Sequence, residues 1–441
     1  MEQKNPGVLE FTEPFQKEKE SKYRWLVLFI TFLAIVVTFI DRVNLSAAAP
    51  GMMKEFKWSP AVMGIVLSAF SWSYMIAQIP GGYLLDRFGI KKVYSLSFSF
   101  WGLITMATST VSSVFGLGFF RVLLGLSEAP LYPGLTKILY TWFKKTQSAF
   151  AMTILSVALN VGLAVGAKVS TWSVHNFGWR PMFVITGLIS LIIVPVYFLL
   201  YREFSPKETP ATNSGQTTAA GKDLKWYHLL KERNILALTL GYFGANYSLY
   251  LFITWLPDYF VKQWHFSLMK TGTFAAIVFL SGLIGKPFFG WLSGYLIKRG
   301  WSVTASRKTM MVVLSLLGAS IGIAAIAPNP ILAAVLLAVA ETTGQAGGSI
   351  TWATAADITP RGMAAQTGGI QNMASGFAGI VAPIVTGFLL AATGSFYLPL
   401  IVAALICLLS AASYGLLLGK VEPVDLKYIS AARSEVTSHT I

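Results

Sequence analysis

The stretch Phe39-Ile40-Asp41-Arg42-Val43-Asn44 places an adjacent acid and base inside an otherwise apolar run from Trp25 to about Ala49. A run of about 20 apolar residues is long enough to cross a bilayer as a helix. Charged side chains at that depth are costly to keep, and they usually mark a functional site. Neighbouring residues on a helix point about 100° apart, so Asp41 and Arg42 cannot pair face to face. Each therefore needs a partner on another helix or contact with a water-filled cavity.

The composition of the whole chain indicates a polytopic α-helical membrane protein. Of the 441 residues, 54% are hydrophobic and 12% are charged, whereas soluble proteins carry about 25% charged residues. The net charge of +15 is also typical of nucleic-acid binding, but the Lys and Arg residues collect in short loops, as they do on the cytoplasmic side of membrane proteins. We therefore expect a lipid bilayer as partner and no nucleic acid.

The sequence offers no reactive centre of a familiar kind. Its single cysteine, Cys407, allows no internal disulfide or thiolate metal cluster, and no metal-ligand spacing links the four histidines. It contains no nucleophile–base constellation and no phosphate-binding loop. We expect a protein that is not an enzyme and that has no metal and no cofactor.

Apolar segments alternate with short loops in a pattern of six, linker and six. The segments fall at 25–49, 61–84, 91–111, 114–139, 147–173, 181–201, 234–262, 270–297, 308–327, 330–354, 363–392 and 396–419. The sequence predicts an all-α membrane protein with twelve transmembrane helices in two pseudo-symmetric six-helix bundles. The predicted regions are an N-terminal cytoplasmic segment 1–24, a bundle 25–201, a cytoplasmic linker 202–232, a second bundle 233–419 and a cytoplasmic tail 420–441.

Basic loops and an internal repeat fix the expected layout. If the segments alternate, most basic loops fall on one side, which should be the cytoplasm, with both termini inside. We expect a multi-pass protein of the cell (inner or plasma) membrane. Residues 81–92 after the second segment resemble residues 289–300 after the eighth. Duplicated six-helix halves are typical of secondary transporters, whose site lies between the halves near mid-membrane.

The loop Gly82-Tyr83-Leu84-Leu85-Asp86-Arg87-Phe88-Gly89-Ile90-Lys91-Lys92 resembles the signature of the major facilitator superfamily between helices 2 and 3, G-x-L-a-D-r-x-G-r-k. The copy after the eighth segment is degenerate, with Gly294 where the acid would stand. The resemblance implies a gating role for Asp86 and Arg87, which would latch the helix ends in the outward-facing state.

Within that superfamily the chain resembles the anion:cation symporter family, which includes bacterial galactonate, glucarate and hexuronate transporters. The matching stretches are Asp41-Arg42-Val43-Asn44, residues 120–130, Tyr132-Pro133-Gly134, Thr254-Trp255-Leu256-Pro257 and Asn372. The resemblance implies that Asp41 and Glu128 are the protonatable pair and Arg121 their partner. It also implies that Tyr74 and Asn372 lie near the substrate.

Arg121 and Glu128 also suit proton coupling on physical grounds. They are seven residues apart, hence on one helix face, separated by about 10.5 Å of rise. Desolvation at mid-membrane favours a protonated Glu128, whereas a nearby arginine favours the charged form. A carboxyl held between these influences can bind and release a proton. The alternatives are a fixed ion pair between Glu128 and Arg121, and for Asp41 a polar clamp between helices.

Further mid-helix groups are candidates for substrate binding. The predicted set is Arg42, Tyr74, Gln78, Asn160, Tyr250, Lys286 and Asn372. Lys286 either pairs with Glu341 as a structural ion pair or binds a carboxylate. Lys168 either extends its ammonium group to the membrane interface or is one of the deep basic residues that make the cavity net positive once the acids are protonated. Polar side chains in membrane helices often serve only as contacts between helices.

We therefore expect a proton symporter that imports a small organic anion, a sugar acid (hexonate, hexarate or hexuronate), by alternating access as a monomer. Deep bases outnumber deep acids once the acids are protonated, which suits an anion. Alternatives are a carrier of an aromatic or amino-derived acid, coupling to sodium instead of protons, and a membrane nutrient sensor that binds without transporting.

Overall fold

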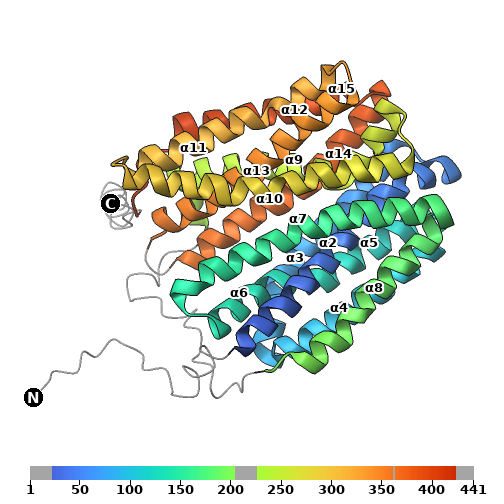
Figure 1. The fold of residues 1–441 in the computed structure, drawn as a ribbon, viewed down its shortest axis with the longest axis horizontal. Helices are drawn as coiled ribbons and strands as arrows, with labels where there is room; N and C mark the ends of the chain where they lie inside the picture. The colour runs from blue at the N-terminus through green and yellow to red at the C-terminus, as the bar shows by residue number, and fades with distance from the viewer. Residues whose placement is uncertain (1–21, 204–225, 361–362, 424–441) are drawn as a thin grey trace, which may run out of the picture.

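The computed structural model describes residues 22–203, 226–360 and 363–423, which are helical apart from short connections. Most of the predicted N-terminal segment, linker and tail lies outside these ranges. Figure 1 shows the helices in two groups lying side by side, one from each half of the chain. The predicted all-α fold with two helical bundles is confirmed.

Each group is built from long helices with short connections. The first group comprises α2 (Tyr23–Phe56), α3 (Pro60–Phe88), α4 (Ile90–Ala107), η1 (Thr108–Thr110), α5 (Val114–Glu128), α6 (Leu131–Trp142), α7 (Lys145–Phe177) and α8 (Trp179–Leu200). The second comprises η3 (Trp226–Lys231), α9 (Arg233–Trp264), α10 (Leu268–Lys298), α11 (Val303–Gly318), α12 (Ser320–Ile323), η4 (Ala324–Ile326), α13 (Pro330–Ile358), α14 (Ala364–Thr393), α15 (Tyr397–Ala412) and η5 (Ser413–Leu417).

Eleven segments in the described ranges are long and apolar enough to cross a membrane. The remaining predicted span, 91–111, corresponds to α4 followed by η1, which together complete the set of twelve. Three other predicted spans are divided: 114–139 into α5 and α6, 308–327 into α11, α12 and η4, and 396–419 into α15 and η5.

The break between α5 and α6 falls directly after Glu128. Pro130 lacks the backbone N–H that would continue the helix, and its ring opposes a regular turn before it. Gly81 of α3 lies against this break, because a Cβ added there would meet Pro130 Cα at 3.1 Å. The proline thus bends the fourth membrane segment where its buried carboxylate lies.

Many helices begin with a polar cap that the sequence supplies. The side chains of Ser59, Ser113, Ser267, Ser302 and Asn329 each accept a hydrogen bond from the backbone N–H three residues later. Such caps satisfy donors that the first helical turn leaves free. They set the starts of α3, α5, α10, α11 and α13.

The two groups touch closely at the end of the molecule where α3 and α10 begin. At the end where α3 begins, a Cβ on Gly64 would lie 2.4 Å from Pro383 O of α14, and a Cβ on Gly272 of α10 would lie 1.9 Å from Thr171 Oγ1 of α7. Lys168 Nζ donates to Thr273 Oγ1 at 2.6 Å in the same region. Glycines permit this approach of backbones. The groups are therefore sealed together at that end.

Candidate functional site

A cavity of about 790 Å³ lies between the two groups of helices. Every residue predicted to bind substrate lines it: Arg42, Tyr74, Gln78, Asn160, Tyr250, Lys286 and Asn372. The first four come from the first group of helices and the last three from the second. A site between two halves is where alternating access requires a substrate to bind.

The cavity occupies one side of the helix interface. Its wall is drawn from the middles of the helices and from the ends at which α2 and α9 begin, as in Phe39, Met152 and Trp291. The opposite ends of the helices are those joined by the glycine contacts of Gly64 and Gly272. The cavity is thus closed toward the ends where α3 and α10 begin.

Arg42 and Glu128 form an ion pair at the cavity wall. Arg42 Nε donates to Glu128 Oε2 at 3.0 Å, and both side chains are almost fully buried. The guanidinium also lies 4.8 Å from the ring centres of Phe39 and Tyr74, and 4.9 Å from that of Phe70. Arg42 Nη2 and Glu128 Oε1 have no hydrogen-bond partner among the residues that the structure describes. The pair is therefore held by one hydrogen bond, and each residue keeps a polar atom that can form another.

The expected partnership of Arg121 with Glu128 is not the contact that the structure forms. Arg121 lies over the ring of Phe70 at 5.2 Å, and its Nε has no hydrogen-bond partner. Within the described ranges Arg121 makes no ion pair. The seven-residue spacing placed Arg121 and Glu128 on one face of a helix, but Arg42 of α2 reaches the carboxylate from across the bundle.

Asp41 lies behind the cavity in a closed polar cluster. Its carboxylate accepts hydrogen bonds from Trp101 Nε1 of α4, from Ser190 Oγ of α8, and from Asn44 Nδ2 at 3.3 Å. Asp41 is fully buried. These contacts tie α2 to α4 and α8, as a polar clamp would. Proton binding by Asp41 stays a prediction.

Lys286 and Glu341 both line the cavity, yet they form no ion pair within the part of the chain described. Glu341 Oε1 instead accepts from Gln345 Nε2 at 3.0 Å, one helical turn along α13. The structural pairing of Lys286 with Glu341 is therefore wrong as a direct contact. The Lys286 ammonium remains available to the cavity.

Asn160 completes this side of the cavity from α7. The residue is fully buried, and within the described part of the chain neither its Nδ2 nor its Oδ1 has a hydrogen-bond partner. Its Oδ1 faces Gly282 of α10, where an added Cβ would lie 2.9 Å away. Leaving a buried amide unpaired costs about 1–3 kcal/mol. Such a group in a cavity wall is prepared for a polar ligand.

Two cavity residues were not predicted from the sequence to bind substrate. Tyr132 and Trp352 line the wall together with the predicted residues. Another deep acid, Asp258, is fully buried in α9 and pairs with Lys262 at 2.9 Å, outside the cavity. The i,i+4 spacing of Asp258 and Lys262 was the signal that would have revealed that pair.

Asp86 and Arg87 lie at the exposed end of α3. Asp86 Oδ1 is bonded by Lys137 Nζ of α6 at 2.9 Å, and the same ammonium donates to Leu85 O at 2.9 Å. The guanidinium of Arg87 lies 5.3 Å from the ring centre of its neighbour Phe88. Lys137 was not identified from the sequence, because its partner lies 51 residues away.

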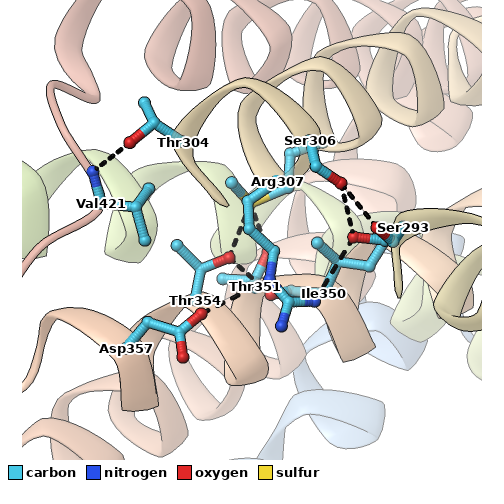
Figure 2. Close-up of polar contacts among 10 residues, drawn as sticks. Ser293, Thr304, Ser306, Arg307, Ile350, Thr351, Thr354, Asp357 and Val421 are labelled. Carbon is cyan, nitrogen blue, oxygen red and sulfur yellow. Dashed lines mark hydrogen bonds and ion pairs between the residues drawn. The ribbon is translucent and has the colours of Figure 1, made fainter. Parts of the chain in front are cut away.

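The second half has its own polar cluster at the corresponding helix ends (Figure 2). Arg307 of α11 pairs with Asp357 of α13, with Nε to Oδ2 at 3.4 Å, and its Nη1 lies 3.5 Å from Ser293 Oγ of α10. Ser293 and Ser306 hydroxyls lie 3.0 Å apart. Gly294 stands where the first half has an acid. In the second half Arg307 instead contacts Ser293, the neighbour of Gly294, and the acid Asp357 of another helix.

Comparison with known proteins agrees with this architecture. Residues 31–306 match the family model of the Major Facilitator Superfamily. The chain is 31% identical to a probable galactarate/D-glucarate transporter (GarP) of Escherichia coli K12, over 93% of this chain and 98% of that protein. It is 29% identical to a D-galactonate transporter of Escherichia coli O6:H1, over 93% of this chain and 99% of that protein.

The solved structure of a bacterial homologue of the human lysosomal transporter Spinster, in an inward-facing and unoccupied conformation, is similar in fold. It aligns with a TM-score of 0.75 at 18% identity, covering 90% of this chain and 97% of that one. The nucleoside transporter NupG aligns with a TM-score of 0.69 at 15% identity, covering 89% and 98%.

Proposed function

This chain belongs to the Major Facilitator Superfamily and is a membrane transporter, not an enzyme, and from this premise we propose that it imports a sugar acid together with protons. Relatives at 29–31% identity are named as transporters of galactarate, D-glucarate or D-galactonate. The protein acts in the cell membrane as a monomer with both termini in the cytoplasm. The cavity then faces the cytoplasm, on the side of the basic loops.

The observation that carries the proposal is the ion pair between Arg42 and Glu128 at the cavity wall. A carboxylate from the substrate and the carboxylate of Glu128 compete for the same guanidinium. Protonation of Glu128 removes its charge and releases Arg42, whose Nη2 already lacks a partner. Substrate and proton therefore bind together, which is the requirement for symport.

Asp41 contributes a second proton site next in sequence to Arg42. Its position between Trp101 and Ser190 couples α2 to α4 and α8. A change in the charge of Asp41 alters the strength of these bonds and so the packing of three helices. Arg121, which forms no ion pair among the described residues, supplies a positive charge near both acids.

The remaining cavity residues hold the hydroxyl groups of the substrate. Tyr74, Gln78, Tyr250 and Asn372 carry donors and acceptors along the wall. A polyhydroxy acid satisfies such groups, whereas an aromatic acid leaves them unpaired at about 1–3 kcal/mol each. Alternating access follows if the substrate binds the two states of the cavity with different affinity.

Uptake into proteoliposomes tests the proposal. A panel of D-galactonate, D-gluconate, D-glucarate, D-glucuronate and an aromatic acid is offered with and without an inward proton gradient, and with a sodium gradient instead. We expect concentrative uptake of a sugar acid under the proton gradient alone. Uptake driven only by sodium, or transport of the aromatic acid alone, contradicts the proposal. Saturable binding without uptake of any acid would indicate a sensor.

A further inference from the structure

The cavity has a second cationic position that the coupling pair does not use. Lys286 lies near the middle of α10, lines the cavity, and makes no ion pair in the described ranges. An unpaired ammonium at membrane depth is costly, so it is kept where water or an anion reaches it. Lys286 belongs to the second half of the chain, whereas Arg42 belongs to the first.

The surroundings of Lys286 form a built polar pocket. One turn before Lys286, Gly282 leaves room for the buried and unpartnered amide of Asn160, whose Oδ1 would lie 2.9 Å from a Cβ at that position. The same added atom would lie 3.3 Å from Gln345 Cγ. Gln345 in turn donates to Glu341, which occupies one oxygen of that acid. Lys286 thus offers unused donors to this part of the cavity, beside the buried and unpartnered amide of Asn160.

Charge balance favours an anion at this position. The charged groups on the cavity wall are Arg42, Lys286 and Glu341, and Glu128 contacts Arg42. The other deep charges of the site, Asp41 and Arg121, lie behind the wall. When Asp41 and Glu128 are both protonated, three cations (Arg42, Arg121 and Lys286) face one remaining acid (Glu341). The site then carries two uncompensated positive charges, which a dianion neutralises and a monoanion does not.

We infer that Lys286 of the C-terminal half, assisted by Asn160 of the N-terminal half, forms a second anion subsite, so that this carrier selects substrates with an anionic group at each end. The inference rests on the proposed function. One carboxylate of the substrate binds Arg42 once Glu128 is protonated, and the other binds Lys286. A six-carbon diacid joins the two halves through its ends, whereas a monoacid of the same length leaves Lys286 without a partner.

D-Glucarate and D-gluconate make the test, because they differ only in the second carboxylate. Uptake of each is measured in proteoliposomes for the wild type, Lys286→Gln, and the matched control Lys298→Gln, which changes a lysine at the end of the same helix. We expect the wild type to show a lower KM for D-glucarate than for D-gluconate. Lys286→Gln should raise the KM for D-glucarate by about tenfold or more, the usual value of a lost charge-assisted hydrogen bond. The KM for D-gluconate should change by less than about threefold, and Lys298→Gln should resemble the wild type.

A second comparison separates this role from a structural one. If Lys286 served mainly to compensate Glu341, Lys286→Gln would impair both substrates and lower the melting temperature, and the double variant Lys286→Gln/Glu341→Gln would restore transport. That result overturns the inference, as does an equal loss for both acids. A wild type that carries D-gluconate but not D-glucarate overturns the inference and leaves the proposed function standing, whereas a wild type that carries no sugar acid overturns the proposed function itself.

Discussion

Arg42 Nε lies 3.0 Å from Glu128 Oε2, although the two residues are 86 positions apart in the chain. The bond joins α2 to the last residue of α5, at the break before Pro130. Removing one member of such a buried pair leaves an uncompensated charge, which costs about 3–5 kcal/mol. In the proposed mechanism this pair links proton binding to substrate binding, and substitutions at the two residues can separate these events.

Glu128→Gln should uncouple transport from the proton gradient. The variant imitates the protonated acid, so Arg42 stays free for substrate. We expect exchange of labelled for unlabelled sugar acid to persist while gradient-driven accumulation falls to the level without a gradient. Arg42→Gln should abolish both, and Arg42→Gln/Glu128→Gln should recover stability without recovering uptake. Undiminished accumulation by Glu128→Gln would show that Glu128 carries no coupled proton.

Asp41→Asn distinguishes a proton site from a polar clamp. The amide keeps an oxygen that can accept from Trp101 or Ser190, so a clamp would be largely preserved. We expect a melting temperature in detergent close to that of the wild type and a loss of proton-driven uptake. Ser190→Ala, which removes one donor but no titratable group, is the matched control. If both variants lose uptake and stability in parallel, Asp41 acts as a clamp.

Gly125→Ala should separate α3 from α5 next to the coupling pair. An added Cβ would lie 2.1 Å from Ser73 Oγ and 2.4 Å from Phe70 O, the residue whose ring faces Arg42 and Arg121. Overpacking of this kind costs about 1–3 kcal/mol. Gly118→Ala in the same helix meets nothing within 4 Å and serves as the control. Thermal unfolding in detergent measures both, and equal melting temperatures would contradict the close packing.

Gly64→Ala should hold the halves apart at the sealed end. Its Cβ would lie 2.4 Å from Pro383 O, a contact that exists only while that end is closed. A cysteine in place of Met152, in the cavity wall, reports access because the natural Cys407 is buried. We expect labelling of this cysteine by an impermeant thiol reagent to slow in Gly64→Ala. The rate should fall by roughly tenfold for each 1.4 kcal/mol by which the substitution disfavours the state with the cavity open. Gly369→Ala, with nothing within 4 Å, should leave labelling unchanged.

Asp86→Asn tests the helix-end latch. The pair of Asp86 with Lys137 is solvent-exposed, so its loss should change the free energy of unfolding by less than about 1 kcal/mol. Because it joins α3 to α6 at the open end of the cavity, we expect a change in Met152→Cys labelling and in uptake rate. Glu55→Gln breaks another exposed pair, with Arg180 at 2.8 Å, and is the control. If the two variants behave alike, the latch has no gating role.

The sequence was enough for the architecture because hydropathy and loop charge are local properties. The lengths of the apolar runs predicted the helices, and the repeated loops after α3 and α10 predicted two similar halves. Breaks such as the one at Pro130 were less visible, since a proline within an apolar run either kinks a membrane helix or divides it. Mid-helix depth also identified residues that line the cavity, including Lys286 and Asn160.

What the sequence determined by itself was the membrane fold, the two halves and the inventory of deep charges, because each follows from the spacing of apolar and charged residues along the chain. Only the tertiary structure decided which charges meet. The helical spacing favoured Arg121 as the partner of Glu128, but the packing of α2 against the bundle brought Arg42 to it. Likewise Lys286 of α10 and Glu341 of α13 share a depth but form no ion pair in the described ranges, and Glu341 instead accepts from Gln345 within its own helix. Depth can be counted along one helix, whereas a contact between helices depends on their rotation and approach.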